Sequence, residues 1–253
     1  MSDQKIALIT GGSRGLGRNT ALTLAAQGVD VIFTYHSNQA AAEEVKAAIA
    51  EMGQQAEYLQ LDTGIVGSFG DFKLSLEQTL QDKWQRSNFD FLVNNAGVGA
   101  HAMIGQTSEE TFDQLLNIQF KGVYFLTQEL LPIIADGGRI VNISTGLTRF
   151  ALPGYAAYAS MKGAVETFTK YLAKELGGRS ITANIVAPGA IDNDFNKAAF
   201  THNPQIVDFI ASQTALGRVG KSSDIGSVVA FLCSDAAGWV NAQRLEASGG
   251  MFL

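Results

Sequence analysis

Short apolar runs rich in β-branched residues alternate along the chain with longer segments of helical period. The strand-like runs occupy residues 6–10, 29–34, 57–61, 89–93, 139–143 and 181–186. Segments between them, such as residues 40–52, carry apolar side chains at the spacing of one helix face. This alternation predicts an α/β fold, a doubly wound parallel sheet of about seven strands with helices on both faces. Ligands of such a sheet bind at the carboxyl ends of its strands.

The length of the chain favours one domain. Its 253 residues suit a single α/β unit over residues 1–253, and no repeat or Pro/Ser-rich linker divides them. The polar stretch 81–88 is expected to extend a surface helix before the fourth strand. The 27 glycines against four prolines indicate many tight turns between strands and helices.

Composition also excludes some classes of partner. A net charge of −6 argues against nucleic acid, whose binding needs a basic surface. Cys233 is the single cysteine, so no intrachain disulfide can form, and His36, His101 and His202 do not share a metal-ligand spacing. No apolar run approaches the ~18 residues of a membrane span, and residues 1–5 enter a strand without a leader. We therefore expect a cytoplasmic protein that uses neither metal nor membrane.

A glycine-rich turn follows the first strand and opens a helical run over residues 18–27. Glycine lets a backbone turn sharply and approach a pyrophosphate at a helix N-terminus. The expected contacts are Gly11, Ser13, Arg14, Gly15, Leu16 and Gly17. The glycines are spaced more widely than in G-x-G-x-x-G, and the alternative is a plain glycine-rich turn.

The end of the second strand indicates which dinucleotide would bind. An NAD site places a carboxylate there for the ribose 2′-hydroxyl, but no acidic residue occurs between Thr34 and Glu43. Arg14 and the donors of His36, Ser37 and Asn38 suit a 2′-phosphate instead. The sequence thus predicts NADP(H), unless Arg14 is only a solvated loop charge.

Tyr158 and Lys162 are the strongest candidates for chemistry. They lie four residues apart in a helical pattern that runs to Leu176, so they share a helix face. A nearby ammonium favours phenolate and would move the tyrosine pKa toward neutrality, where the group can exchange a proton. The alternative is a half-buried aromatic ring over a lysine stem. Tyr155 is a weaker candidate, because its i+4 partner is Ala159.

Two polar residues accompany this pair. Ser144 closes the fifth strand, where the sheet presents its functional edge, although it could equally be a helix cap or a loop serine. Asn117 lies in a segment whose buried stripe is otherwise apolar, so its amide either fixes a kink or holds a water in a relay.

Three further turns lie at ends of predicted strands. Residues 94–97 allow a close approach of backbone to a ribose, or form a plain turn. Asp62 could accept a hydrogen bond from an adenine amine. Pro188-Gly189 forms a rigid corner before residues 190–217, a long segment that we predict to be a lid over the substrate.

Taken in order, these motifs resemble the short-chain dehydrogenase/reductase superfamily over nearly the whole chain, and within it the 3-oxoacyl-[acyl-carrier-protein] reductase-like group. The resemblance is carried by Thr10–Gly17, Asn94–Gly97, Asn117, Ser144, Tyr158 with Lys162, Pro188-Gly189 and Ser248-Gly249-Gly250. It implies a Rossmann fold that binds NADP(H) and a homo-oligomer, a tetramer or dimer, to which Met251-Phe252-Leu253 would contribute.

The resemblance also implies roles for the site residues. Tyr158 would protonate a carbonyl oxygen as hydride arrives from the nicotinamide, and Ser144 would hydrogen-bond the same oxygen. Lys162 would hold the nicotinamide ribose and lower the pKa of Tyr158, while Asn117 would hold a water that links Lys162 to solvent. Further cofactor contacts carried over in this way are Asp62, Thr63, Asn95, Ala96, Gly97, Pro188, Gly189 and Ile191. Asn193 stands where the family usually has threonine for the carboxamide.

The predicted function is reversible hydride transfer between NADP(H) and a small-molecule carbonyl or secondary alcohol, with a 3-oxoacyl thioester as one option. Leu147, Phe150, Leu152 and Tyr155, with Phe195 and Phe200 in the lid, suggest an apolar substrate. One rival is a catalytically silent NADP(H) sensor, which would not need all four polar site residues. A methyltransferase is a weaker rival, because it would want a carboxylate at the end of the second strand.

Overall fold

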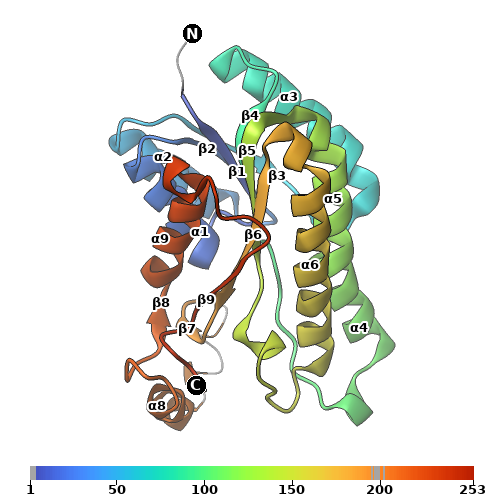
Figure 1. Cartoon of the computed structure of the whole chain (residues 1–253), viewed down its shortest axis with the longest axis vertical. Coiled ribbons are helices and arrows are strands. Elements are labelled where there is room, and N and C mark those ends of the chain that lie inside the picture. Colours follow the sequence, from blue (N-terminus) through green and yellow to red (C-terminus); the bar gives the residue numbers. More distant parts are fainter. Residues whose placement is uncertain (1–3, 195, 197–199, 202) are drawn as a thin grey trace.

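A parallel seven-stranded sheet in the order β3-β2-β1-β4-β5-β6-β9 forms the centre of the molecule (Figure 1). The computed structural model describes residues 4–194, 196, 200–201 and 203–253. The strands are β1 (Ile6–Ile9), β2 (Asp30–Tyr35), β3 (Ala56–Gln60), β4 (Phe89–Asn94), β5 (Ile134–Ile143), β6 (Thr182–Pro188) and β9 (Arg244–Ala247). This topology confirms the predicted doubly wound sheet.

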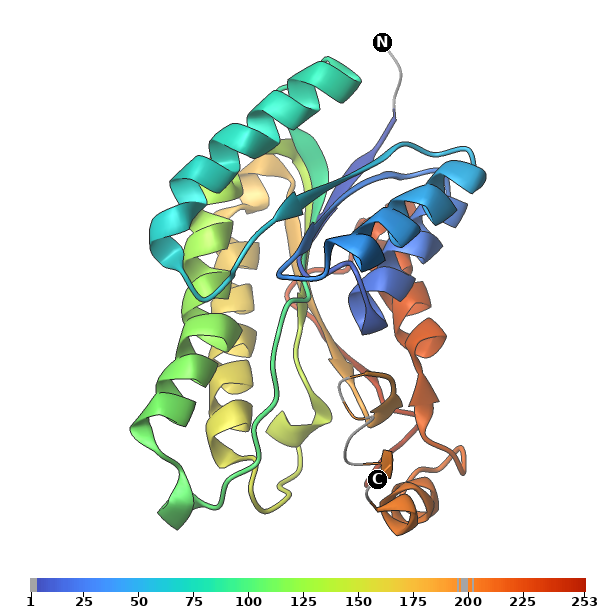
Figure 2. The same ribbon diagram turned by 180° about the vertical axis from the view of Figure 1, so that it is seen from behind.

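Helices cover both faces of the sheet (Figure 2). On one face lie α1 (Gly15–Ala26), α2 (Gln39–Glu51) and α9 (Ser222–Cys233); on the other lie α3 (Phe69–Trp84), α4 (Glu109–Leu116), α5 (Gly122–Leu130) and α6 (Ala156–Glu175). Strand β1 shows why the pattern predicts this: Ala7 and Ile9 pack into the first core, and Ile6 and Leu8 into the second. A strand covered on both faces reads as a continuous apolar run.

Short helical turns and a small second sheet complete the chain. The turns are η1 (Val66–Ser68), η2 (Ile104–Gln106), η4 (Leu131–Ile133), η5 (Gly146–Thr148), η6 (Gly177–Arg179) and η7 (Asp235–Ala237), with a π-helix, η3 (Asn117–Lys121), between α4 and α5. Beyond the carboxyl end of β6, β7 (Ile191–Asp192) pairs with β8 (Gly220–Lys221), and α8 (Pro204–Ser212) lies between them in sequence. Within the described residues, no helix is both long and apolar enough to cross a membrane.

Three elements differ from the sequence-based expectation. Strand β5 begins at residue 134, before the predicted 139, and the β4–β5 register shifts between Phe89 and Phe91. Helix α3 ends at Trp84 instead of extending to residue 88, because Gln85 takes a left-handed conformation with φ of 51°. Strand β9 was not located by the apolar pattern, since an edge strand with half-buried side chains lacks a continuous apolar run.

Candidate active site

A cleft of about 1540 Å³ opens at the carboxyl ends of the central strands. Its walls contain most of the predicted site residues: Gly11, Ser13, Arg14, Gly15, Leu16, His36, Ser37, Asn38, Asp62, Thr63, Asn95, Ala96, Gly97, Ser144, Tyr158, Lys162, Pro188, Gly189, Ile191 and Asn193. Gly17 and Asn117 lie outside this lining. The cleft sits where the strand order reverses between β1 and β4, the expected ligand position in such a sheet.

The glycine-rich turn is shaped to bring backbone against a ligand. Gly11 and Gly15 have φ of +66° and +55°, in the left-handed region where glycine is favoured. A Cβ on Gly17 would lie 2.2 Å from the carbonyl oxygen of Gly11, so only glycine lets the helix start this close to the turn. The N-terminus of α1 has no side-chain cap, which leaves its first backbone N–H groups for an anion.

The turn after β4 is tied to the glycine-rich turn. The hydroxyl of Thr10 accepts hydrogen bonds from the backbone N–H of Asn95 (3.0 Å) and of Ala96 (2.9 Å). In return, the Asn95 side-chain amide donates to the carbonyls of Thr10 (2.9 Å) and Gly11 (3.2 Å). The side chain of Asn95 therefore braces the two turns together, and its contact with a ribose stays a prediction.

Basic and polar groups surround the end of the cleft beside β2. Arg14 and Arg18 line it from the start of α1, and Arg18 was not among the predicted residues. The imidazole Nε2 of His36 lies 3.4 Å from a carboxylate oxygen of Asp62. The side chain of Asn38 caps α2, so its oxygen is already engaged. This end of the cleft thus offers guanidinium and imidazole groups to an anion.

Lys162 and Tyr158 lie side by side on α6, as the four-residue spacing predicted. The Lys162 ammonium donates a hydrogen bond to the carbonyl of Ile143 (2.8 Å) and lies 5.9 Å from the centroid of the Tyr158 ring. Burial lowers the pKa of Lys162 to about 8.

The sequence predicted a lowered pKa for Tyr158, and this prediction is wrong for the chain without a bound cofactor. Burial raises the pKa of Tyr158 above its ordinary value, and neighbouring Tyr155 adds to the rise. The ammonium of Lys162 does not offset this effect, because it is held by the carbonyl of Ile143 and faces the Tyr158 ring. At neutral pH the phenol consequently keeps its proton.

Ser144 occupies the end of β5, where its backbone N–H donates to the carbonyl of Val186 (2.8 Å). Its hydroxyl donates a hydrogen bond to the carboxylate of Glu166 (2.6 Å). Glu166 is one further turn along α6, so Tyr158, Lys162 and Glu166 follow one another at intervals of four residues. Sequence reasoning missed Glu166, although continuing the same spacing by one turn would have found it.

The π-helix η3 contributes an amide side chain to the wall of the cleft. Asn117 begins this segment, and its carbonyl accepts a hydrogen bond from the N–H of Gly122. The residue that lines the cleft is Gln119, only 1% exposed, whose amide donates to the carbonyl of Val98. Asn117 thus lies at a helix irregularity, and a water relay through Asn117 stays a prediction. The wall of the cleft beside Gly97 carries Gln119.

The opposite wall begins at the corner after β6. A Cβ on Gly189 would lie 2.9 Å from Ser248, so the chain ends of β6 and β9 approach closely here. Across the cleft, the side-chain nitrogen of Asn193 lies 3.9 Å from the position of a Cβ on Gly15. Asn193 therefore faces the glycine-rich turn from the position where the family has threonine.

The remaining part of the cleft is largely apolar and aromatic. The predicted Leu147, Phe150, Leu152, Tyr155 and Phe200 line it, together with the unpredicted His101, Ile206, Phe209, Ile210, Met251 and Phe252. The rings of His101 and Tyr155 meet edge to face at 5.1 Å, and Phe252 lies 4.7 Å from Phe150. Phe195 of the predicted lid, and His202, lie outside the described residues.

The C-terminal residues form part of this wall. The N–H of Phe252 donates to the carbonyl of Gln213 (2.9 Å), and Met251 forms an antiparallel bridge with Thr214. Met251 is 3% exposed, whereas Leu253 is 95% exposed. The expectation that all three residues serve as an exposed contact between subunits is therefore wrong for Met251, which is buried within its own chain.

Comparison with known proteins gives matches along the full chain. A family model described as enoyl-(acyl carrier protein) reductase matches residues 11–252. The 3-oxoacyl-[acyl-carrier-protein] reductase FabG of Staphylococcus aureus strain Mu50 is 33% identical over 255 residues, covering 100% of both chains.

Two solved structures superpose closely. The promiscuous reductase LugOII, described as catalysing keto-reduction at C1 during lugdunomycin biosynthesis, gives a TM-score of 0.93 with 40% identity, covering 98% of each chain. The angucycline C-6 ketoreductase LanV with bound NADP gives a TM-score of 0.93 with 37% identity, covering 98% of this chain and 95% of LanV. Similarity at this level extends over the whole fold.

Proposed function

Because the chain belongs to the short-chain dehydrogenase/reductase superfamily, we propose that it is an NADP(H)-dependent oxidoreductase that reduces the carbonyl group of a small molecule. One observation carries the proposal. Tyr158, Lys162 and Ser144 converge in one cleft with the glycine-rich turn, so a proton donor stands beside a site suited to a dinucleotide. A sensor of NADP(H) would not need this convergence.

The state of the tyrosine suits the acid step of a reduction. NADPH, when bound, supplies the hydride. Burial raises the pKa of Tyr158, so the phenol is protonated at neutral pH and can donate to a carbonyl oxygen that gains negative charge. Lys162 is held by the carbonyl of Ile143 with its ammonium over the face of the Tyr158 ring, and we assign it to binding the nicotinamide ribose. Ser144 stands beside the same position at the end of β5.

The cleft also suits NADP(H) as the dinucleotide. The uncapped start of α1 and the close turn around Gly17 fit a pyrophosphate. Arg14, Arg18 and His36 line the end where a 2′-phosphate would lie. Solved LanV, similar over the whole chain, holds NADP. These observations support a preference for NADP(H) over NAD(H). We also assign Asn193, which faces the glycine-rich turn, to the carboxamide side of the cofactor.

We assign the apolar part of the cleft to the substrate, with residues 190–217 as a lid of the single domain. The aromatic wall of this part of the cleft is formed by Phe150, Phe209 and Phe252, and it favours a ring-bearing ketone over an acyclic one. LugOII is described as catalysing keto-reduction at C1 and LanV as an angucycline C-6 ketoreductase, so both relatives act on ketones. The 3-oxoacyl thioester named for the FabG relative is the second candidate.

We further propose a cytoplasmic homo-oligomer, a tetramer or dimer. The face of α4, α5 and α6 exposes Phe112, Tyr124, Phe125 and Tyr171. Apolar patches of this kind mark contacts between subunits. Sedimentation should give a mass above that of one chain, and Tyr124→Glu should lower it; a monomer at micromolar concentration would contradict the proposal.

Turnover of NADPH tests the function. Purified protein should oxidise NADPH with members of a panel of cyclic ketones, aromatic ketones and 3-oxoacyl thioesters. Tyr158→Phe should lose nearly all turnover and still bind NADPH, measured by fluorescence titration, because the ring stays while the proton donor goes. Tight NADPH binding without turnover across the panel would favour the sensor, and a preference for NADH would contradict the assignment of Arg14 and His36.

A further inference from the structure

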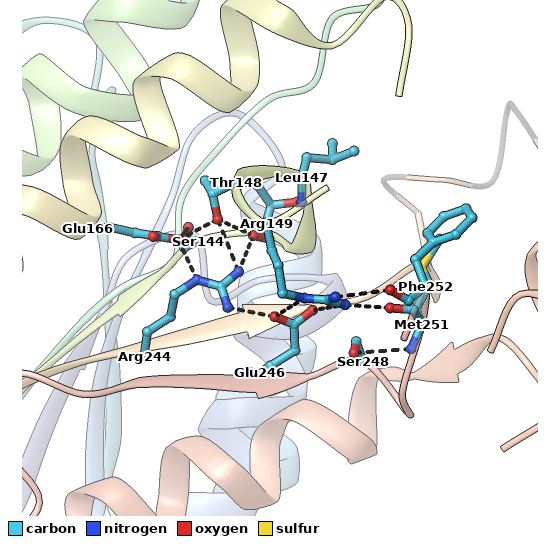
Figure 3. A network of polar contacts seen from close by, with 11 residues as sticks. Ser144, Leu147, Thr148, Arg149, Glu166, Arg244, Glu246, Ser248, Met251 and Phe252 are labelled. Carbon is cyan, nitrogen blue, oxygen red and sulfur yellow. Dashed lines mark hydrogen bonds and ion pairs between the residues drawn. The ribbon is translucent and has the colours of Figure 1, made fainter. Parts of the chain in front are cut away.

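Arg149, in the loop between β5 and α6, binds the C-terminal residues that line the substrate part of the cleft (Figure 3). Its guanidinium donates hydrogen bonds to both carboxylate oxygens of Glu246, at 3.1 and 3.2 Å. It also donates to the backbone carbonyls of Phe252 (3.0 Å) and of Met251. One side chain thus joins the loop after β5, strand β9 and the end of the chain.

Glu246 keeps Arg149 in this position. The carboxylate of Glu246 also accepts a hydrogen bond from Arg244 (2.6 Å). Although burial opposes its charge, hydrogen bonds from Arg149 and Arg244 hold the pKa of Glu246 below its ordinary value. Glu246 is therefore ionised at neutral pH, and both of its oxygens accept charge-assisted hydrogen bonds from Arg149.

The backbone of Phe252 has a conformation that its neighbours must hold. Its φ of +52° lies in the left-handed region, which is uncommon for residues other than glycine and costs free energy. The N–H of Phe252 donates to the carbonyl of Gln213 (2.9 Å), and the carbonyl of Phe252 accepts from Arg149. Arg149 thus supplies one of the two backbone hydrogen bonds that keep this residue in place.

The ring of Phe252 contacts both other members of the aromatic wall. Its centroid lies 4.7 Å from that of Phe150 and 6.4 Å from that of Phe209 in α8. The guanidinium of Arg149 lies 5.4 Å from the centroid of the Phe150 ring. The described residues that line the cleft include all three rings but not Arg149, so Arg149 supports the wall without forming its surface.

We propose that Arg149 is a positioning residue that makes the cleft select flat, fused-ring ketones, because it holds Phe252 where the ring can pack on such a substrate. The energy of an aromatic contact depends on the geometry of the two rings, so it is gained only if the ring of the protein is held in place. A flexible open-chain ketone gains less from that geometry. The inference rests on the proposed carbonyl reduction and adds the residue that sets the substrate preference.

The test measures kcat/KM, with NADPH in excess, for the fastest fused-ring ketone and the fastest open-chain ketone of a panel that includes α-tetralone and 2-decanone. Wild-type protein should prefer the fused-ring ketone about 10-fold, as expected for one well-placed aromatic contact. Arg149→Met should reduce the preference to about twofold. The change should appear as a higher KM for the fused-ring ketone, with kcat within about twofold, because binding is weakened while Tyr158 is untouched.

Two comparisons separate positioning from a loss of stability. Phe252→Ala should reduce the preference to about the same value, and Arg149→Met added to it should cause no further change, because Arg149 acts through Phe252. Arg179→Met is the matched control. Arg179 also binds one carboxylate, that of Asp136, and two backbone carbonyls, but it does so at the amino ends of β5 and β6. This variant should keep the wild-type preference.

Arg149→Lys gives a second measurement that does not depend on the folding of Arg149→Met. Lysine keeps the positive charge but lacks the planar fork that binds both oxygens of Glu246 and two carbonyls at once. The preference of Arg149→Lys should therefore fall between those of wild type and Phe252→Ala.

A wild-type preference near 1, or a preference that Arg149→Lys and Arg149→Met leave unchanged, would overturn the inference while leaving carbonyl reduction intact. A further fall when Arg149→Met is added to Phe252→Ala, or an equal fall in Arg179→Met, would also overturn it. Absence of turnover across the whole panel would overturn the proposed function itself, and this inference with it.

Discussion

Replacing Lys162 by methionine should stabilise the fold at pH 7 and abolish turnover. Lys162 is 4% exposed, and burial lowers its pKa from 10.5 to about 8. Keeping Lys162 charged in the folded chain therefore costs free energy, because the buried ammonium has lost its hydration. Methionine has a similar length and no charge, so it can occupy the same space without that penalty. Stability given up at a functional position is common in enzymes.

The size of the gain follows from the pKa. Lowering the pKa of Lys162 from 10.5 to about 8 corresponds to a free-energy cost of about 3 kcal/mol for the charged form, at ~1.4 kcal/mol for each pKa unit. Loss of the hydrogen bond to Ile143 leaves a buried carbonyl without this donor, which offsets about 1–2 kcal/mol. The expected net gain in the free energy of unfolding is about 1–2 kcal/mol, which raises Tm by about 2–8 °C for a chain of this size.

The gain should depend on pH in one direction. Between pH 8 and 10.5 the unfolded chain binds more protons at Lys162 than the folded chain, so wild-type stability rises with pH across this window. The advantage of Lys162→Met is then complete below about pH 8 and disappears toward pH 10.5. Urea denaturation of cofactor-free protein at several pH values measures it. Lys170→Met, at an exposed position of the same helix, should show no such dependence.

A Lys162→Met protein that is less stable than wild type at pH 7 would refute the reasoning. So would a difference in unfolding free energy that stays constant up to pH 10.5, because it would show that the charge of Lys162 carries no desolvation penalty.

Three further measurements test the cofactor end and the core. Arg14→Ala should weaken NADPH binding about 10-fold or more, because a charge-assisted bond to the 2′-phosphate is lost, and should change NADH binding by no more than about twofold. Isothermal titration measures both affinities, and an equal loss for the two cofactors would contradict the assignment of Arg14. Gly17→Ala should abolish binding of both cofactors, because its Cβ would meet the carbonyl of Gly11, and retained affinity would count against the close turn. Burial raises the pKa of the Cys233 thiol to about 12, so the native protein should not react with a thiol reagent at pH 8 but should react in urea; fast native labelling would show that the thiol is accessible.

Buried central strands were predictable because both faces of the sheet are covered. Residues 6–9 are apolar throughout and residues 30–35 are apolar except for Asp30 and Thr34, and the structure places strands there within a residue of the prediction. Strand β9, at residues 244–247, has one neighbour and half-buried side chains, so its sequence carries no such pattern. Whether a strand shows a continuous apolar pattern depends on its position in the sheet, and the local sequence does not encode that position.

The site residues also differ in whether the sequence alone could reveal them. Tyr158 and Lys162 were found because helical spacing puts residues four apart on one face. The role of Asn117 stays a prediction, and local spacing did not reveal Gln119, which lines the cleft two residues further along η3. Arg244 meets Glu166 from 78 positions away, a contact that only the folded sheet creates.

The two parts of the cleft come from segments that lie far apart in the sequence. The glycine-rich turn lies at residues 10–17, whereas Met251 and Phe252 complete the substrate wall. Proteolytic cleavage just before Met251 would therefore remove part of the substrate wall and leave the glycine-rich turn in place. A protein nicked there should still bind the dinucleotide while its substrate preference changes.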